Sequence, residues 1–513
     1  MHCIAHIDMD CFYAQVEAVR LGIDYRTVPF IVVQWQFVLS VSYPARRFGI
    51  SRHTPLSEAI KKCPHVIISH AATCVAGDPQ HRYYETPRRE THKISLEPYR
   101  EASRKIFDVL GSFEGVRVEK ASIDEAYLDV TEAAKYELEE MAAQRRGTRL
   151  CWEDVVEPTT IVIPDRQDEI DSWFEERGRA FSEVFDVSLH PDATEEDKVL
   201  LCAASRVVQQ IRQKLYDDLR YECSAGIAHN KLLAKNISSR YKPNRQTLLF
   251  SDRVASAMWD TKYQTIRGFG GRLGETVCDL CDGEELCRDA WLLSKQTLRA
   301  SLPCAVDPNC VYLRLRCYDD DEFAVGTAHK SIMATKVFPS YAVFDGEIRK
   351  WVHALSEELC SRYVSLCAKY KVKGQKLNVK LDTKVRDHFE VVACRTLSLP
   401  EIVNPSTLTS IAMQPITATM LAKSGTRINA VAMTIGSFKS QPCSVNRQAT
   451  LTELFAMKNA CKRDRETDAI RVEDASPLPL KKKRQQFLKG NNGRKKEVIN
   501  LEDEDKLEVI YID

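Results

Sequence analysis

A chain of 513 residues is too long to fold around one hydrophobic core, so the sequence predicts several domains. Hydrophobic residues make up 44% of the chain and charged residues 28%, as in globular proteins, and no apolar run is long enough to span a membrane as a helix. The formal net charge of +1 excludes a uniformly basic protein, so any contact with nucleic acid must come from local patches.

The first predicted element is a strand that carries carboxylates at its end. In "AHIDMDC", residues 5–11, the side chains of His6, Asp8 and Asp10 alternate with apolar ones and therefore share one face. From Phe12 the apolar residues recur at helical spacing, so a helix follows directly behind the acids. Such a strand end is either the edge of a site or a solvated surface, and the spacing leaves both open.

Strand-like and helix-like segments alternate along the rest of the N-terminal half. In chain order the sequence predicts helices at 54–66 and 99–113, a strand at 121–130, an acidic insertion at 132–197 that is partly helical and partly loose, a helix at 199–219, and a strand–helix–strand unit at 223–250.

The C-terminal half divides into three stretches. Short helical segments at 256–309 surround the Gly-rich "IRGFGGRLG". From about 310 to 440, strands at 330–339, 376–385 and 430–438 and a helix at 348–366 indicate a separate α+β domain. After Gln441 the periodicity fades and the charges become blocky, which predicts a disordered tail.

Asp124 and Glu125 form a second acidic feature inside an apolar strand pattern. Because they are consecutive, a regular strand would send them to opposite faces, so both can reach one site only if the chain bends there. Carboxylates at two strand ends, with Asp8 at the other, could share Mg²⁺, which takes oxygen ligands. Two such ions about 4 Å apart would serve an in-line phosphoryl displacement. The alternative is a pair of solvated acids.

Two basic runs offer the cations that a triphosphate needs. They are "SYPARRFGISR" at 42–52 and "RYKPNRQ" at 240–246. Arginine suits bidentate phosphate contacts and lysine acts as a compact charge. Either run by itself could equally be a solvated face.

Six motifs in order over residues 1–250 resemble the Y-family of translesion DNA polymerases, and within it the eta branch: "HIDMDCFYAQVE", "SYPARRFG", "YREAS", "SIDEAYLD", "CSAGIAHNKLLAK" and "KPNRQT". The resemblance continues more weakly to residue 440. It implies an α+β multidomain fold shaped as a right-hand polymerase, with a ferredoxin-like palm, small fingers, a helical thumb with a helix-hairpin-helix, and an α+β little finger. The implied bounds are 1–13 and 80–255 for the palm, 14–79 for the fingers, 256–309 for the thumb, 310–440 for the little finger and 441–513 for a disordered regulatory tail.

The resemblance also implies a role for individual residues. Asp8, Asp124 and Glu125 would be the catalytic, metal-binding carboxylates, and the carbonyl of Met9 would complete one shell around two Mg²⁺ ions, for which Mn²⁺ could substitute. Asp10 matches the motif but is not usually a ligand in the family.

The nucleotide would be held by aromatic and basic residues. Tyr13 takes the place of the steric gate, an aromatic ring that packs under the sugar and excludes a 2′-hydroxyl. The other nucleotide-binding residues that the resemblance implies are Tyr43, Arg46 and Lys242 for the triphosphate, and Gln34 and Arg52 near the nascent base pair. The chain departs from the family between Gln34 and Tyr43, where the connection is short and lacks the usual glycines, and Pro44 replaces an acidic residue.

Glycine and cysteine clusters mark the 256–309 stretch. Gly268, Gly270, Gly271 and Gly274 resemble the DNA-binding turn of a helix-hairpin-helix, where glycines let the backbone approach phosphates, although spacing alone fits an ordinary helix connection. "CDLCDGEELC" at 278–287 holds only three cysteines and no histidine at ligand spacing, so we expect no zinc site there. The 18 cysteines of the chain are scattered singly, and reduced, mostly buried thiols are expected.

The tail carries three short motifs. Gln448, Leu451 and Phe455 resemble a sliding-clamp-binding peptide, and the alternative is an amphipathic turn. The basic runs at 481–484 and 494–496 are typical of a nuclear localisation signal or a nucleic-acid-binding tail. "VINLEDED" and "EVIYID" resemble SUMO-interacting motifs, which would add a strand to a partner's sheet.

The leading hypothesis is a nuclear, template-directed DNA polymerase that binds primer-template DNA and dNTP, with no membrane attachment. The resemblance implies synthesis past damaged bases, with ultraviolet pyrimidine dimers as the expected lesion. A deoxycytidyl transferase of the same family, a non-catalytic DNA-repair scaffold and a nucleotidyl cyclase with a similar palm are the alternatives. The intact carboxylate set argues against the scaffold, and the basic thumb and extra C-terminal domain argue against the cyclase.

Overall fold

The computed structural model describes residues 1–440 except 146–149, 192, 325, 327–329, 343–344, 386–387 and 423–426. Within this part of the chain, no helix combines the length and the apolar character needed to cross a membrane. Its cysteines are free thiols, and more than half of them are buried.

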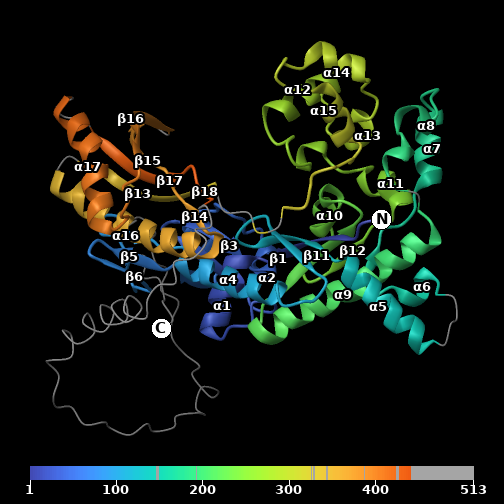
Figure 1. The fold of residues 1–513 in the computed structure, drawn as a ribbon, viewed down its shortest axis with the longest axis horizontal. Helices are drawn as coiled ribbons and strands as arrows, with labels where there is room; N and C mark the ends of the chain where they lie inside the picture. The colour runs from blue at the N-terminus through green and yellow to red at the C-terminus, as the bar shows by residue number, and fades with distance from the viewer. Residues whose placement is uncertain are drawn as a thin grey trace, which may run out of the picture. The chain divides into compact units, whose positions relative to one another are not determined.

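A six-stranded mixed sheet contains the N-terminal strand (Figure 1). β1 pairs antiparallel with both β9 and β11, whereas β12 runs parallel to β11 and β10. The strands, in spatial order, are β10 (Ile161–Val162), β12 (Gln246–Leu248), β11 (Cys223–Ala228), β1 (Ile4–Met9), β9 (Glu125–Asp129) and β8 (Arg117–Lys120).

The alternation along β1 gives the two faces of this sheet different coverings. Ala5, Ile7 and Met9 are buried in the core formed with helices α4 (Glu97–Leu110) and α9 (Glu195–Leu219). The other face carries His6 and Asp8 and is covered by helix α10 (Lys231–Ser238). In Figure 1, α10 lies above strands β1 and β11 and α9 lies below them. The predicted alternation of the first strand is therefore confirmed up to Met9, where the strand ends.

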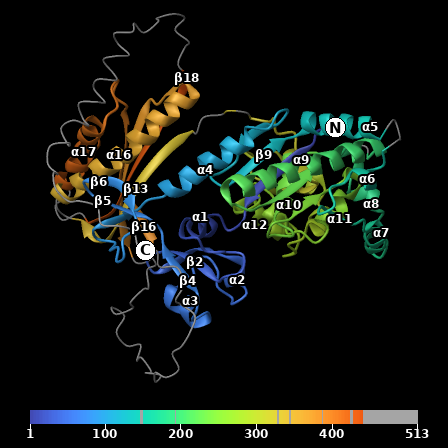
Figure 2. The same ribbon diagram turned by 90° about the horizontal axis from the view of Figure 1, so that it is seen from below.

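Two smaller sheets follow in the N-terminal half. Helix α1 packs against the three-stranded sheet β3–β2–β4 (Figure 2). The second is the sheet β6–β5–β7. The elements are α1 (Phe12–Leu21), β2 (Phe30–Gln34), β3 (Phe37–Val41), α2 (Tyr43–Arg46), α3 (Leu56–Lys62), β4 (Ile67–His70), β5 (Thr73–Val75), β6 (Asp78–Arg82) and β7 (His92–Ile94).

The acidic insertion is more regular than its composition suggested. Its apolar residues Val155, Ile170 and Phe174 are fully buried, so the segment is folded rather than partly loose. Buried apolar side chains fix it against the rest of the chain in spite of its charge. The elements are α5 (Thr131–Gln144), α6 (Trp152–Val155), β10, α7 (Gln167–Glu175), α8 (Phe181–Val184) and the 3₁₀ helix η1 (Val187–Leu189).

Short helices surround Trp259 and Trp291, which are both buried. The last of these helices, α15, continues past residue 309, where the sequence analysis expected this stretch to end. Its residues Val311 and Leu315 are buried in the same core as the two tryptophans. The elements are η2 (Ser251–Arg253), α11 (Val254–Met258), η3 (Tyr263–Thr265), α12 (Arg272–Leu280), α13 (Cys287–Ala290), α14 (Lys295–Ser301) and α15 (Pro308–Leu315).

The described residues of 331–440 contain strands and helices that share a core of their own. Strand β16 and helix α17 were not predicted, because β16 is a largely exposed edge strand and α17 contains Pro415, which normally interrupts a helix. The sheet order is β13 (Ser331–Ala342), β17 (Ile428–Gly436), β15 (Lys376–Val385) and β16 (His388–Ser398); the other elements are α16 (Asp345–Tyr370), α17 (Pro405–Ala422) and the pair β14 (Val372–Lys373) and β18 (Lys439–Ser440).

Candidate active site

Three acidic residues meet at the neighbouring ends of β1 and β9. Asp8 lies directly opposite Glu125 in the antiparallel ladder, so both side chains project from the same face. Asp124 lies one residue before β9, where the chain bends, and its carbonyl accepts a hydrogen bond from the backbone N–H of Met9 at 3.0 Å. The hydroxyl of Ser122 fixes this bend: it donates to the Asp124 carboxylate at 2.6 Å and accepts from the Glu125 N–H at 3.0 Å.

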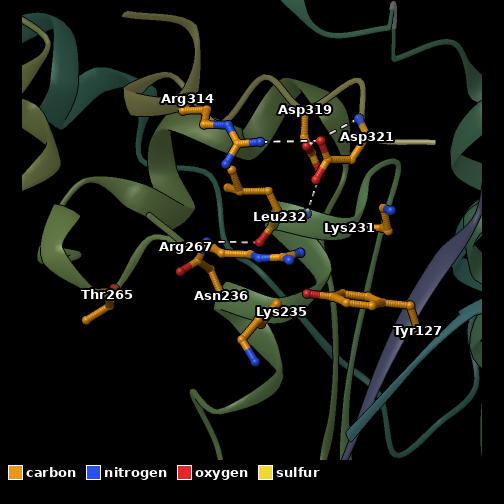
Figure 3. A pocket seen from close by; sticks show the side chains of 10 residues that line it. All are labelled: Tyr127, Lys231, Leu232, Lys235, Asn236, Thr265, Arg267, Arg314, Asp319 and Asp321. Carbon is orange, nitrogen blue, oxygen red and sulfur yellow. Dashed lines mark hydrogen bonds and ion pairs between the residues drawn. The ribbon is translucent and has the colours of Figure 1, made fainter. Parts of the chain in front are cut away.

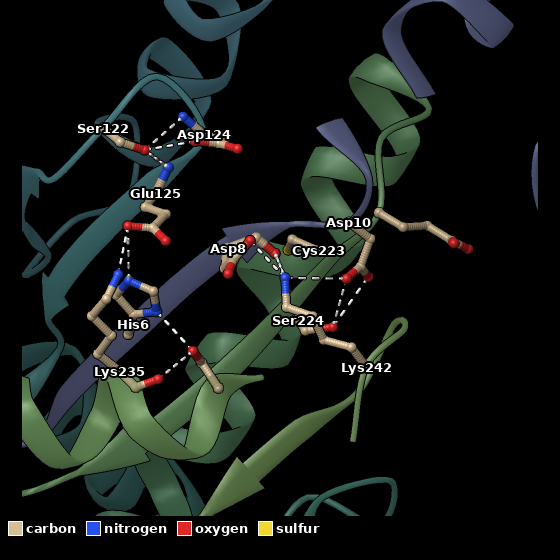
Figure 4. Close-up of polar contacts among 12 residues, drawn as sticks. His6, Asp8, Asp10, Ser122, Asp124, Glu125, Cys223, Ser224, Lys235 and Lys242 are labelled. Atoms are coloured by element: carbon tan, nitrogen blue, oxygen red, sulfur yellow. Dashed lines mark hydrogen bonds and ion pairs between the residues drawn. The ribbon is translucent and has the colours of Figure 1, made fainter. Parts of the chain in front are cut away.

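Two lysines pair with these carboxylates (Figure 4). The Lys242 ammonium lies 2.6 Å from Oδ1 of Asp8, and the Lys235 ammonium lies 2.7 Å from Oε2 of Glu125. Burial raises the pKa of Asp8, and Lys242 opposes that effect. The buried ring of His6, whose Nε2 is 3.9 Å from Glu125, and the Lys235 ammonium together hold the pKa of Glu125 at about 2. Both pairs keep the site electrically balanced.

The donor types fit a hard divalent cation, since they are carboxylate oxygens with a backbone carbonyl at Met9. In the arrangement that the described residues adopt, however, no three acidic, histidine or cysteine side chains converge tightly enough to enclose a metal ion. Asp8 and Glu125 are turned toward Lys242 and Lys235 instead. Side-chain rotation away from the two lysines is therefore required before the carboxylates can share a cation.

Asp10 has a different environment from Asp8. Its carboxylate is almost fully buried and accepts hydrogen bonds from the Ser224 hydroxyl at 3.0 Å and the Asn244 backbone N–H at 2.7 Å. The hydroxyl of Tyr43 lies 3.4 Å away and the ammonium of Lys242 3.5 Å away. With its oxygens engaged in this way, Asp10 connects structural elements and does not offer a free ligand.

A cavity of about 540 Å³ lies beside Asp10. It is lined by Tyr43, Arg46, Arg47 of the same basic run, and Arg26, which the sequence analysis did not select. The guanidinium of Arg46 lies 4.2 Å from the centre of the Tyr43 ring, which orients both side chains. The cavity therefore brings the positive charges of three arginines next to Asp10.

Tyr13 is half-buried on α1 and stacks on Tyr99 of α4 with 4.0 Å between ring centres. Burial raises the pKa of Tyr13, as does the charge of Asp124, whereas Arg52 and Arg100 lower it. Tyr13 thus lies within the electrostatic reach of both Asp124 and Arg52, two residues that the sequence analysis selected independently.

Gln34 is not brought to the carboxylates. It ends β2 next to a two-residue hairpin turn and pairs with Phe37. Its side chain lines a cavity together with Trp35, Lys93 and Lys336.

The four glycines lie at the start of α12. Gly271 caps this helix with a φ of +155°, and a Cβ on Gly274 would come within 1.8 Å of the Phe269 carbonyl oxygen. The turn therefore requires glycine at these positions. Figure 3 shows the small cavity beside this segment, which is lined by Arg267, by Arg314 with its partner Asp321, and by Lys231 and Lys235 of α10.

A second large cavity, of about 480 Å³, borders Asp8 and Glu125. Asp8, Glu125 and Lys235 line one wall, and Arg240 and Thr261 line another. Asp8 and Glu125 therefore border this cavity, whereas Asp10 borders the one that carries several arginines.

His6, Lys235 and Arg26 are the site residues that sequence reasoning missed. His6 was placed on the Asp8 face by alternation, and Lys235 lies within a recognised motif, so both had a detectable signal. Arg26 had none, because its place in the cavity depends on the fold. Gln448, Leu451, Phe455, both basic runs and both SUMO-type motifs lie outside the described residues.

Known proteins are similar in sequence to most of the described part of this chain. A model of the impB/mucB/samB family matches residues 7–239, and a model of the C-terminal domain of the same family matches residues 329–451. The N-acetyltransferase eso1 of Schizosaccharomyces pombe is 35% identical over 71% of this chain and 41% of its own length. DNA polymerase eta of Saccharomyces cerevisiae is 32% identical over 55% of this chain and 47% of its own, and DNA polymerase eta of Arabidopsis thaliana is 30% identical over 70% and 50%.

The chain spans about half the length or less of these relatives. The two family matches together cover more than half of the chain, and both include motifs described above. The carboxylates, Tyr13, Tyr43, Arg46 and Lys235 all fall within the first match. The chain therefore belongs to the impB/mucB/samB family, the Y-family of DNA polymerases.

Proposed function

We propose that this chain is a DNA-directed DNA polymerase that synthesises past damaged bases. The observation that carries the proposal is the pair of facing strand ends: Asp8 and Glu125 line a cavity beside α10, and Lys242 contacts both Asp8 and Asp10, the acid that lines the arginine-rich cavity. A phosphoryl-transfer site needs clustered carboxylates next to cations that can bind a triphosphate, and these two features adjoin here.

In this proposal Asp8, Asp124, Glu125 and the Met9 carbonyl hold two divalent cations, Mg²⁺ or its substitute Mn²⁺. When bound, such cations activate the primer 3′-hydroxyl and stabilise charge on the phosphates. Because Lys242 and Lys235 pair with two of these carboxylates, both lysines must turn away for the site to be loaded.

The reaction is attack of the primer 3′-oxygen on the α-phosphorus of a dNTP. A P–O bond forms to the primer, the bond to the β-phosphate breaks, and pyrophosphate leaves. Tyr43, Arg46 and Lys242 bind the triphosphate, and Lys242 becomes available for a phosphate when it turns away from Asp8. Tyr13 packs under the sugar and excludes a 2′-hydroxyl.

The remaining assignments follow the family. The six-stranded sheet would serve as the palm, the β3–β2–β4 sheet as the fingers, the helices of 254–315 as the thumb and the 331–440 unit as the little finger. Arg52 and Gln34 would approach the nascent base pair or the incoming nucleotide, and the Gly268–Gly274 turn a DNA phosphate. Location in the nucleus, clamp binding through Gln448, Leu451 and Phe455, and SUMO binding through the tail extend the proposal.

We propose ultraviolet pyrimidine dimers as the lesion, because two of the relatives described above carry the name DNA polymerase eta. The test is primer extension with the full chain and each dNTP separately, on an undamaged and on a dimer-containing template. Extension on both templates, with dATP inserted opposite the dimer thymines, is expected. Insertion of dCTP alone on every template would replace the proposal with deoxycytidyl transfer.

An Asp124→Ala, Glu125→Ala double variant provides the control for the site. It should lose primer extension while retaining primer-template binding, because neither carboxylate supplies positive charge to the DNA. Extension by this variant at the unchanged rate would contradict the assignment of the catalytic carboxylates.

A further inference from the structure

A buried carboxylate lies behind Tyr13 and has no part in the proposed chemistry. Glu17 is fully buried on α1, although glutamate is seldom found in an interior without partners. Its Oε1 accepts hydrogen bonds from the hydroxyls of Tyr99 at 2.9 Å and Tyr83 at 3.0 Å, and its Oε2 accepts from Arg20 at 2.8 Å. Three donors from three places in the chain therefore converge on one side chain.

Tyr99 connects Glu17 to Tyr13. The two α1 residues are four positions apart, so they lie one above the other on the same helix face. The Tyr99 ring stacks on the Tyr13 ring at 4.0 Å with an interplanar angle of 16°, while its hydroxyl reaches Glu17 one turn away. Because Tyr99 is itself fully buried, the stack has little room to move.

We propose that Glu17 is a positioning residue for sugar discrimination, acting through Tyr99 on Tyr13. This inference rests on the proposed role of Tyr13 as the sugar gate. A steric gate discriminates only if its ring resists displacement by a 2′-hydroxyl, and a ring stacked on an anchored neighbour resists more than a free one. Burial and the Glu17 carboxylate raise the pKa of Tyr99 well above its usual range, so its hydroxyl remains a donor.

Tyr83 supplies a matched control. Its hydroxyl donates to the same oxygen of Glu17, but its ring packs under the Arg20 guanidinium at 3.5 Å and has no stacking contact with Tyr13. Tyr99→Phe and Tyr83→Phe each remove one hydroxyl donor from the same carboxylate. Only the first removes the anchor from the ring that touches the gate.

The experiment measures the ratio of kcat/KM for a dNTP to that for the matching rNTP, together with the thermal unfolding midpoint. Tyr99→Phe should lower the ratio by about tenfold, the change produced by about 1.4 kcal/mol of lost discrimination. Tyr83→Phe should leave the ratio unchanged while lowering the unfolding midpoint comparably. An equal change of the ratio in both variants, or none in Tyr99→Phe, would overturn the inference.

Substitutions at Glu17 test the anchor itself. Glu17→Gln retains an oxygen acceptor for both hydroxyls and should stay close to the wild-type ratio, whereas Glu17→Leu removes the acceptor and should match Tyr99→Phe. Should Glu17→Leu not fold, the two tyrosine variants still decide the question.

Tyr13→Ala separates failure of this inference from failure of the proposed function. Absence of dNTP incorporation by the wild-type chain would end the polymerase assignment. A Tyr13→Ala variant with an unchanged ratio would end the gate assignment. A lower ratio in Tyr13→Ala without any change in Tyr99→Phe would end only the role of Glu17.

Discussion

Asp8 and Asp10 are two positions apart, but their side chains lie in different environments. Asp8 is partly exposed at a strand end and pairs with one mobile ammonium, whereas Asp10 is buried and accepts from a hydroxyl and a backbone N–H. A carboxylate paired with a long, flexible lysine can change partners. One held by Ser224 and by the backbone of Asn244 cannot do so without disturbing β11 and the loop after α10.

The two aspartates should therefore respond differently to removal. Asp10→Ala should lower the free energy of unfolding by about 3 kcal/mol, because it leaves several donors without an acceptor in a buried place. Asp8→Ala should lower it by about 1 kcal/mol or less, since the pair it breaks is partly exposed. Urea unfolding of both variants measures the difference, and equal losses would contradict the distinction.

At the scale of elements, one close approach places α10 over the sheet and with it Lys235. A Cβ on Gly226 in β11 would lie 2.1 Å from the Ala234 carbonyl oxygen and 2.7 Å from Ile237. The helix can therefore lie this near the strand only where the strand has no side chain. This contact puts Lys235 within reach of Glu125 and Ser238 within 2.9 Å of the buried ring of His6.

Gly226→Ala should displace α10 and destabilise the protein. We expect a loss of about 3 kcal/mol in the free energy of unfolding, at the upper end of overpacking effects, because a backbone carbonyl cannot rotate aside. Gly283→Ala is the control for a glycine with open space around it, and it should cost less even though its φ is +90°. A smaller loss in Gly226→Ala than in Gly283→Ala would show that α10 is not closely packed on β11.

At the scale of the whole described chain, a buried histidine pair joins three distant segments. Nε2 of His190 lies 3.0 Å from the Arg316 carbonyl oxygen and must donate to it, so Nδ1 accepts from Nε2 of His229 at 3.1 Å. The insertion, the loop after β11 and the end of α15 are connected in this way. Burial lowers the pKa of His190 to about 4 and that of His229 to about 3.

This pair predicts a loss of stability in mild acid. Unfolded histidine binds protons below about pH 6.5. The folded pair does not, so stability is complete above pH 6.5 and falls as the pH approaches 4. Between pH 7 and pH 5 the free energy of unfolding should fall by about 2 kcal/mol for each histidine. Urea unfolding across this range measures the fall, His229→Gln should remove the share of one histidine, about 2 kcal/mol, and an unchanged fall in that variant would contradict the assignment.

The sequence by itself determined the elements whose pattern depends on near neighbours. Alternation placed Asp8 on a strand face, helical spacing located α4 and α9, and ordered motifs indicated the family that the comparisons bear out. The sequence also predicted that the chain must bend at Asp124 and Glu125 if both are to reach one site, and hydrogen bonds with Ser122 hold a bend there.

Tertiary structure alone decided which side chains became partners. Glu17 meets Tyr99 across 82 positions and Asp10 meets Ser224 across 214, and no local period relates residues so far apart. Edge strand β16 and the folded insertion were misjudged for the same reason: exposure and burial are set by long-range packing, whereas composition reports only local preference. The acids and the lysines of the candidate site could therefore be found in the sequence, but the pairing of Lys242 with Asp8 and of Lys235 with Glu125, and the contacts of Glu17 behind Tyr13, depend on the fold.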